Sequence, residues 1–174
     1  HGDFNTPASS PSGNIHGMAL AALFGRGSFG AMGWTQADIE EERVAIVGLR
    51  DLDSEERKAL KDSGIATYTM HDIDSRGVDS VVEDALTRIL NNVDALHVSL
   101  DLDVLDPNEA PGVGTPVRGG ITYREGHTAM ELVAETDALQ SMEIVEVNPI
   151  LDSHNQTAEL GVELLASAIG RQIL

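Results

Sequence analysis

Cysteine is absent from this sequence of 174 residues. Disulfide bonds and thiolate metal sites are therefore excluded, and a structural zinc site is not expected. Aromatic residues make up only 3% of the chain. No window reaches the roughly 18 consecutive apolar residues that a membrane-spanning helix needs, and no signal-peptide pattern is present. We therefore expect a soluble, cytoplasmic protein.

Basic residues are also scarce, with 11 Lys plus Arg against 29 Asp plus Glu and a formal net charge of -18. Such an acidic surface repels nucleic-acid phosphates and anionic lipids, so we expect neither a nucleic acid nor a membrane as a partner. Cationic ligands and metal ions would be attracted instead. Most of the carboxylates are interpreted as part of a solvated surface.

Short apolar segments alternate with amphipathic ones along the chain. Strands rich in Val, Ile and Leu are predicted at 43–49, 95–104 and 141–147. Helices are predicted at about 54–63 with Ser54 as the N-cap, within 77–93, at 122–135 and near the C-terminus. The last helix is expected to bury one stripe, formed by Ala158, Val162, Leu165 and Ile169. This alternation is typical of a parallel sheet with helices on its faces, and the length suits a single domain over 1–174.

The predicted strand 95–104 ends on two carboxylates, Asp101 and Asp103. Because alternate side chains of a strand share a face, both are expected on one face, beside a packed His97. Ionised carboxylates this close repel each other and lose hydration, and a divalent cation compensates most directly. Oxygen ligands with an occasional imidazole suit Mn, Mg or Fe. The alternative is an Asp-x-Asp pair in a turn or a solvated loop.

A second polar cluster is HGDFN at the front of the chain. If this segment is extended, His1, Asp3 and Asn5 point the same way, since alternate residues share a face. A His and an Asp on one face are candidate metal ligands. The alternative is a capping Asp with an exposed His.

Five motifs occur together in this chain: HGDFNTP with SGNIHG, GLRDLD, SLDLDVLDP, GVGTPVRGGITYREG and MEIVEVNP. Over nearly the whole chain they resemble the arginases of the ureohydrolase family. The resemblance implies a three-layer α/β/α arginase-like fold with a mainly parallel sheet and two Mn²⁺ ions at its carboxyl edge. It also implies a binuclear manganese hydrolase, which converts L-arginine to L-ornithine and urea by attack of a metal-bridging hydroxide on the guanidinium carbon.

The resemblance further implies roles for individual residues. The implied metal ligands are His1, Asp3, Asp101 and Asp103, of which Asp101 bridges the two ions. The implied substrate-binding residues are Asn5 and Ser12 at the substrate carboxylate, Asp53 and Glu56 near its α-amino group, and Thr115 and Glu146 at its guanidinium end. The implied catalytic residues are Asp3, which protonates the leaving amine, His16, which passes protons to bulk water, and Glu146.

The family pattern is incomplete at the front of this sequence. The family's Gly-Gly-Asp-His motif, and the Asp two residues before the position of His1, are not in the chain. We therefore expect the C-terminal portion of an arginase-like catalytic domain, with the N-terminal part missing and no activity on its own. The resemblance also implies a homo-oligomer, either a trimer or a hexamer.

Three other functions stay open. An agmatinase or another ureohydrolase acting on a guanidino compound would use the same metal chemistry, but agmatine lacks the carboxylate that Asn5 and Ser12 are expected to bind. A truncated, metal-poor homologue would serve as a non-catalytic subunit. A metal-dependent deacetylase needs a single-metal site with different ligands, and the GVGTPVRGGITYREG and MEIVEVNP stretches argue against it.

Overall fold

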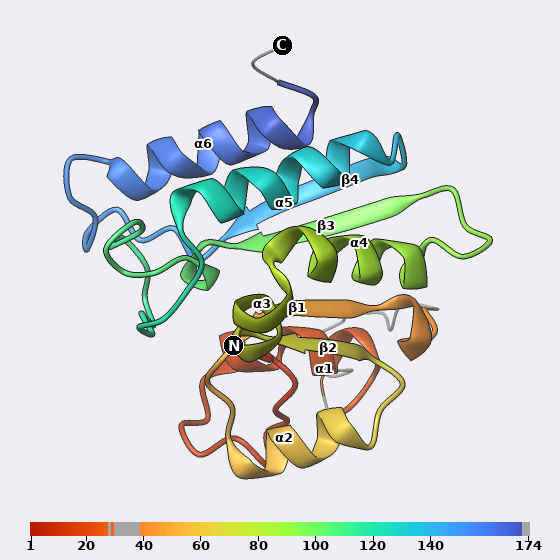
Figure 1. Ribbon diagram of the computed structural model, residues 1–174. Coiled ribbons are helices and arrows are strands. Elements are labelled where there is room, and N and C mark those ends of the chain that lie inside the picture. The colour runs from red at the N-terminus through yellow and green to blue at the C-terminus, as the bar shows by residue number, and fades with distance from the viewer. Residues whose placement is uncertain (28, 30–38, 172–174) are drawn as a thin grey trace.

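The computed structural model describes residues 1–27, 29 and 39–171. The strands in this part of the chain are β1 (Ala45–Leu49), β2 (Ala66–Thr69), β3 (Leu96–Asp101) and β4 (Leu139–Val145). The α-helices are α1 (Ala19–Leu23), α2 (Ser54–Lys61), α3 (Met70–Arg76), α4 (Val78–Ile89), α5 (Tyr123–Glu135) and α6 (Gln156–Ala168). Strands and helices alternate (Figure 1), so the predicted α/β class is confirmed.

Two helices, α3 and α5, begin after a threonine whose hydroxyl accepts a hydrogen bond from a backbone N–H of the first turn. In α5, Thr122 Oγ1 accepts a hydrogen bond from the Glu125 N–H, and Glu125 accepts one from the Thr122 N–H at 2.7 Å, as the sequence predicted. α2 has Asp53 as its N-cap, so the prediction of Ser54 was wrong by one residue. This places the Asp53 side chain where β1 leads into α2.

The strands pair in parallel, β1 with β2 and β3 with β4. Within the described residues these are two separate two-stranded sheets, although the sequence predicted one sheet. The predicted parallel direction is confirmed. β2 had not been predicted, since its four residues are too few to show a clear period.

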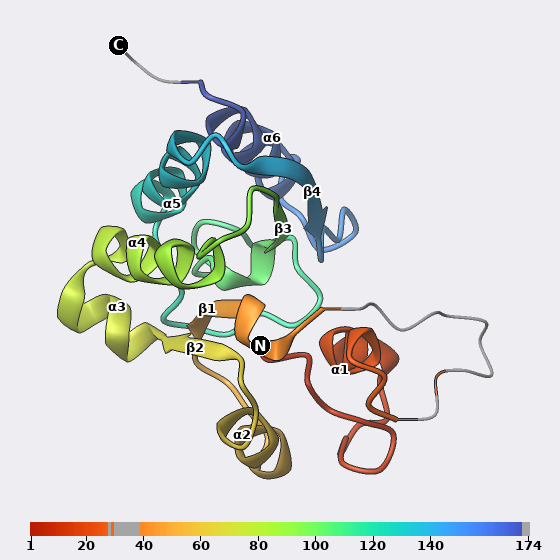
Figure 2. The same ribbon diagram turned by 90° about the vertical axis from the view of Figure 1, so that its right-hand side faces the viewer.

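Helices cover both faces of β1. Ala45 and Val47 pack against the main core, to which α3 and α4 contribute. Ile46 and Leu49 pack instead in a second core with Leu60 of α2. Figure 2 shows α4 and α2 on opposite sides of this strand. The three-layer arrangement predicted from the resemblance is therefore present around β1.

The second pair, β3 and β4, packs one face against α5 and α6. Its other face is polar and exposed in the described structure, where His97 lies 2.8 Å from Ser141 and Ser99 donates to Glu143 at 2.8 Å. The His97 side chain is 55% exposed, so the expectation of a packed imidazole beside the Asp pair was wrong. Its strand position places it on the side of β3 that these helices do not cover.

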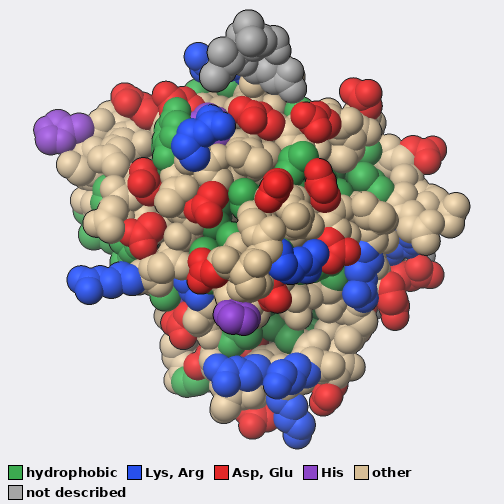
Figure 3. All heavy atoms as spheres, viewed as in Figure 1, with side chains coloured by type: hydrophobic (Ala, Val, Ile, Leu, Met, Phe, Trp, Pro, Cys, Tyr) green, Lys and Arg blue, Asp and Glu red, His purple; other side chains and the backbone are tan. Residues whose placement is uncertain are grey.

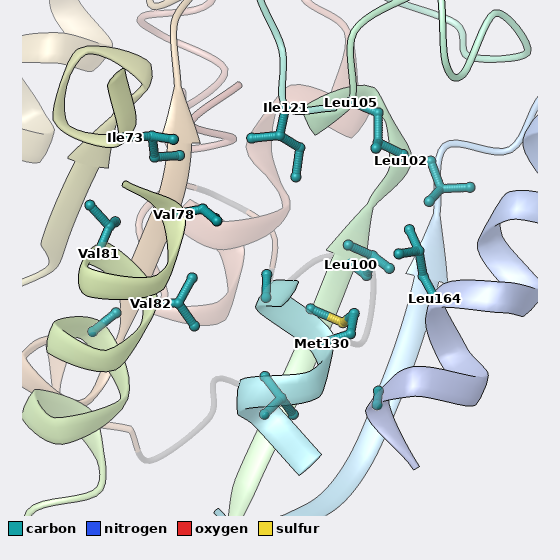
Figure 4. Packing of buried hydrophobic residues seen from close by; sticks show 14 of the residues in the cluster. Ile73, Val78, Val81, Val82, Leu100, Leu102, Leu105, Ile121, Met130 and Leu164 are labelled. Carbon is teal, nitrogen blue, oxygen red and sulfur yellow. The ribbon is translucent and has the colours of Figure 1, made fainter. Parts of the chain in front are cut away.

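The main core lies between the strands and α4, α5 and α6 (Figure 4). In α6 the buried face carries Leu160, Leu164 and Ala168. The predicted stripe was wrong, because Val162 is 66% and Ile169 is 72% exposed. α6 has apolar residues on more than one face, so their spacing could not identify the buried one.

The surface agrees with the interpretation of a solvated acidic exterior. Figure 3 shows Asp and Glu side chains spread over the visible face, without a single dense patch. Among the described residues, none of the helices has the length and apolar character needed to cross a membrane.

Candidate functional site

A cavity of about 120 Å³ lies at the carboxyl ends of β1, β3 and β4. This is the edge where ligands bind in parallel α/β sheets. Every residue that the sequence singled out for the site lines this cavity: His1, Asp3, Asn5, Ser12, His16, Asp53, Glu56, Asp101, Asp103, Thr115 and Glu146. The structure therefore brings together residues from the five motifs, which are up to 145 positions apart in the chain.

The carboxylate pair is arranged by a turn. β3 ends at Asp101, and a 3-10 turn over Leu102–Val104 carries Asp103. The predicted strand to Val104 was therefore too long. Asp101 Oδ1 accepts a hydrogen bond from the Asp103 N–H at 2.9 Å, and the fully buried Leu102 anchors the turn in the main core. The two carboxylates are neighbours because of this turn and not because of strand alternation.

Asp103 connects three segments of the chain. Its Oδ2 atom lies 2.6 Å from His1 Nδ1 and accepts a hydrogen bond from Thr115 Oγ1 at 3.1 Å. The Asp103 residue is only 2% exposed. The side chains of the first motif and of the loop after β3 thus meet at one carboxylate oxygen.

The HGDFN segment is not extended, because Asp3 has a φ of 50°, in the left-handed region. The conformational prediction was therefore wrong, although His1, Asp3 and Asn5 all line the cavity. The Asp3 carbonyl accepts hydrogen bonds from the N–H groups of Leu20 and Ala21 at the start of α1. These bonds hold the segment in place beside α1.

Glu56 holds the same segment from the other side. It is 5% exposed and accepts hydrogen bonds from the N–H groups of Phe4 at 2.9 Å and Asp53 at 3.4 Å. Burial raises the pKa of Glu56, whereas these two hydrogen bonds oppose the rise. A Cβ atom at Gly2 would lie 2.8 Å from Glu56 Oε1, so only glycine allows this close approach.

The loop that follows HGDFN carries a second hydrogen-bonded group. The buried Asn5 donates from Nδ2 to Asp53 Oδ2 at 3.0 Å and accepts from Ser9 Oγ at 2.9 Å. Ser12 is exposed, and its hydroxyl accepts a hydrogen bond from the Asn14 N–H at 3.2 Å. Asn5 is therefore held in one orientation, while the Ser12 hydroxyl remains accessible to a solute.

His16 and Glu146 face each other across the cavity opening. His16 Nδ1 lies 3.9 Å from Glu146 Oε1, and the two side chains are 47% and 28% exposed. Glu146 directly follows β4 and has a φ of 66°, a left-handed conformation that is uncommon for a residue with a Cβ atom. This pair has access both to the cavity and to bulk water.

The electrostatics of the cavity reflect crowded carboxylates. Burial raises the pKa of Asp101 to about 7, and the neighbouring Asp103 adds to the rise. Burial also raises the pKa of Asp3 to about 6, although His1 opposes this. The hydrogen bond to Asp103 raises the pKa of His1 to about 9 against the effect of burial. A divalent cation would relieve this crowding, because it favours the ionised carboxylates.

The donor set fits a hard or borderline divalent ion, since it consists of carboxylate oxygens and one imidazole without sulfur. The arrangement is not that of a preformed ion site. Over residues 1–27, 29 and 39–171, no group of three or more His, Cys, Asp or Glu side chains is placed so that it could hold a metal ion. His1 and Asp103 bond to each other directly. These two side chains would have to separate to coordinate an ion.

Comparison with known proteins decides the family. Residues 1–170 match the family model described as the arginase family. This chain belongs to the arginase family. It is 51% identical to the arginase of Brevibacillus brevis over 176 residues, which cover 100% of this chain and 59% of that protein. The chain therefore spans less than two thirds of the length of this arginase.

Solved arginase structures confirm the predicted fold. The chain is similar to the arginase of Bacillus caldovelox, with 49% identity and a TM-score of 0.95 over 100% of this chain and 59% of that one. It is also similar to the Entamoeba histolytica arginase in complex with L-ornithine, with 33% identity and a TM-score of 0.90, over 98% of this chain and 58% of that one.

Sequence reasoning missed several residues that line the cavity of this arginase-family chain. They are Ser10, Asn14, Gly17, Asp51 and Leu52. Asp51 could have been found, because it lies two residues before Asp53 at the carboxyl end of a predicted strand. Ser10 and Asn14 lie in an irregular loop, where spacing does not indicate which side chains face a ligand.

The role of Glu56 in holding the first motif can be measured as stability. Glu56→Ala leaves the Phe4 and Asp53 N–H groups without their acceptor, so we expect a loss of about 1–3 kcal/mol in the free energy of unfolding. Urea unfolding of the metal-free protein measures this. Glu55→Ala is the control, since Glu55 is exposed on the same turn of α2 and should change stability little. Equal stability of the two variants would contradict the role.

Proposed function

We propose that this chain is the C-terminal portion of an arginase that converts L-arginine to L-ornithine and urea. The observation that carries the proposal is one cavity lined by an imidazole and three carboxylates for cations, and by Glu146 and His16 at its opening. Support comes from relatives named arginase, one of them in complex with L-ornithine. The polypeptide that would contain this chain and the remaining length of its relatives is called the full-length protein below.

The residues that would hold two Mn²⁺ ions are His1, Asp3, Asp101 and Asp103, which all line the cavity. When bound, the ions supply Lewis acidity, which makes hydroxide available at neutral pH. A neutral imidazole and ionised carboxylates are needed as ligands, so binding should release protons from His1, Asp3 and Asp101.

The remaining chemistry falls to side chains of this chain. Hydrolysis adds water to the guanidinium carbon and breaks its bond to the side-chain nitrogen of the substrate, which leaves as an amine and needs a proton. Asp3 is the proposed donor, because its side chain lines the cavity beside the other proposed metal ligands and would lie close to the leaving nitrogen. His16, which is half exposed, is proposed to exchange protons between the cavity and bulk water.

The ends of the substrate are assigned by charge. Among the described residues Glu146 pairs with His16 at 3.9 Å and with no Arg or Lys, and with Thr115 it would face the guanidinium. Asp53 would face the α-amino group. Glu56 also lines this end, but its two oxygens already accept backbone N–H groups, so it would act mainly by holding Phe4 and Asp53. Asn5 and Ser12 would bind the carboxylate.

The second candidate is an agmatinase or another guanidino hydrolase. The exposed Ser12 hydroxyl and the oriented Asn5 amide favour a substrate with a carboxylate, which agmatine lacks. The trimeric or hexameric homo-oligomer and the cytoplasmic location stay predictions from the resemblance.

The test is urea release from L-arginine and from agmatine by the full-length protein loaded with manganese, with and without a chelator. We expect urea from arginine only, and its loss with the chelator. Urea from agmatine alone would show that the protein is an agmatinase. No urea from either substrate would favour the non-catalytic homologue.

A further inference from the structure

Arg50 bridges two loops that build the cavity, although it does not line the cavity itself. It directly follows β1, and its guanidinium donates to three backbone carbonyls. Nη2 donates to Asp103 O at 2.6 Å, to Val117 O at 2.7 Å and to Leu105 O at 3.3 Å. Nε donates to Val117 O at 3.1 Å. One rigid, planar group thus connects β1 with both the turn after β3 and the following loop.

These carbonyls belong to segments with residues of the candidate site. Asp103 is a proposed metal ligand, and Val117 lies two residues after Thr115, which donates its hydroxyl to Asp103 Oδ2. Arg50 therefore holds the main chain of Asp103 and of Val117, which lies two residues beyond Thr115.

In one stretch of the loop between β3 and α5, Arg50 donates hydrogen bonds to the main chain. At one end, Gly112 donates to Thr157 Oγ1 and accepts from the Asn148 N–H. At the other end, Gly119 donates to Asp106. Between these anchors, the described hydrogen bonds to residues 114–118 are those from Arg50 to Val117 and the one from Thr115 to Asp103. Arg50 is thus one of the contacts that position Thr115, together with the hydrogen bond from Thr115 to Asp103 and the bridge between Val113 and Val147.

The close approach of β1 to the turn supports this connection. Gly48 has a φ of 90°, and a Cβ atom there would lie 2.5 Å from Val104 Cγ2. β1 and the turn that carries Asp103 are therefore in contact just before Arg50. The half-buried guanidinium also has Asp51, Asp101, Asp103 and Asp106 near it, which favour its positive charge against the cost of burial.

We propose that Arg50 is a positioning residue, whose side chain helps to fix Thr115 relative to Asp103. It would thereby set the distance between a proposed metal ligand, Asp103, and a residue proposed to face the substrate guanidinium, Thr115. The link to cations and substrate rests on the proposed function. A lysine cannot replace this group fully, because its single ammonium has no counterpart of the Nε–H that donates a second hydrogen bond to Val117 O.

The test compares Arg50→Lys and Arg50→Gln with the unaltered full-length protein. The control is Arg118→Lys, since Arg118 is exposed in the same loop. Hydrogen exchange of the backbone amides in residues 112–120 is measured first. We expect faster exchange in both Arg50 variants, less in Arg50→Lys, and no change in the control. Unchanged exchange in both Arg50 variants would overturn the proposal.

The second measurement is manganese affinity by equilibrium dialysis, together with kcat/KM for L-arginine at saturating manganese. We expect Arg50→Gln to lose about 10–100-fold in affinity or in kcat/KM, as is common for groups that orient metal ligands, with partial rescue in Arg50→Lys. Faster exchange with unaltered affinity and kcat/KM would show a purely structural role and overturn the proposal. If the unaltered protein binds no manganese, the proposed function fails, and the exchange comparison alone then decides whether Arg50 restrains the loop.

Discussion

Asp101→Asn in the full-length protein is expected to reduce manganese-dependent urea release by at least ~1,000-fold, equivalent to ~4 kcal/mol of transition-state stabilisation. The same substitution should raise the melting temperature of the metal-free protein. The two effects have one cause. Asp101 lies beside Asp103 in a largely buried position, which costs free energy unless a cation is present.

The pH dependence follows from the direction of the shift. Folding raises the pKa of Asp101 from 3.8 to about 7, so the folded state binds more protons than the unfolded state between these values. Stability of the metal-free protein should therefore fall as pH rises from about 4 to about 7. Asp3, with a pKa raised to about 6, acts in the same direction. His1, raised from 6.5 to about 9, contributes stability that is lost as pH rises through about 9.

Thermal unfolding of the metal-free protein at pH 5 and pH 8, with and without added Mn²⁺, measures these effects. Asp101→Asn should reduce the loss of stability between the two pH values, and Mn²⁺ should stabilise the unaltered protein more at pH 8, because its ligands must be deprotonated. Asp94→Asn is the control, since Asp94 is an exposed carboxylate before β3. A lower melting temperature for metal-free Asp101→Asn would contradict the explanation, as would manganese-dependent turnover within tenfold of the unaltered protein.

The composition of the site could be predicted because it depends on where strands end. Asp53, Asp101 and Glu146 each lie at or just beyond the carboxyl end of a strand, and parallel strands bring these ends to one edge. The positions of β1, β3 and β4 are visible in their Val, Ile and Leu content, whereas β2 has none of these residues. The assignments of Asp53 and Glu146, like those of Asn5 and Ser12, depended on the resemblance. Asn5 and Ser12 lie in a loop without periodicity.

The local conformations were harder to predict, because tertiary contacts decide them. The sequence LDLDV continues the alternation of β3, but Leu102 enters the main core and the chain turns at Asp101. Asp3 adopts a left-handed conformation, and its carbonyl accepts from the start of α1. In both places the expected grouping of side chains was right, whereas the assumed strand geometry was wrong. No local pattern in the sequence signals these contacts.

Asn5→Asp should separate arginine from agmatine. The amide of Asn5 is held by Asp53 and Ser9, so its replacement places a carboxylate where the proposed function puts the substrate carboxylate. We expect kcat/KM for arginine to fall at least ~100-fold, or ~2.7 kcal/mol, because like charges at a binding contact cost several kcal/mol. Agmatine has no carboxylate and should lose much less. Where agmatine turns over too slowly, its inhibition constant against arginine is measured instead.

Two further variants separate recognition from damage to the loop. Ala8→Asp adds the same charge to an exposed position of this loop and should leave both substrates unaffected. The new carboxylate in Asn5→Asp also faces Asp53, which could disturb the site for any substrate. Ser12→Ala avoids this, because it removes only an exposed hydroxyl, and it should weaken arginine binding alone. Equal losses for arginine and agmatine in both Asn5→Asp and Ser12→Ala would mean that this loop does not bind the substrate carboxylate. The main argument against an agmatinase would then be removed.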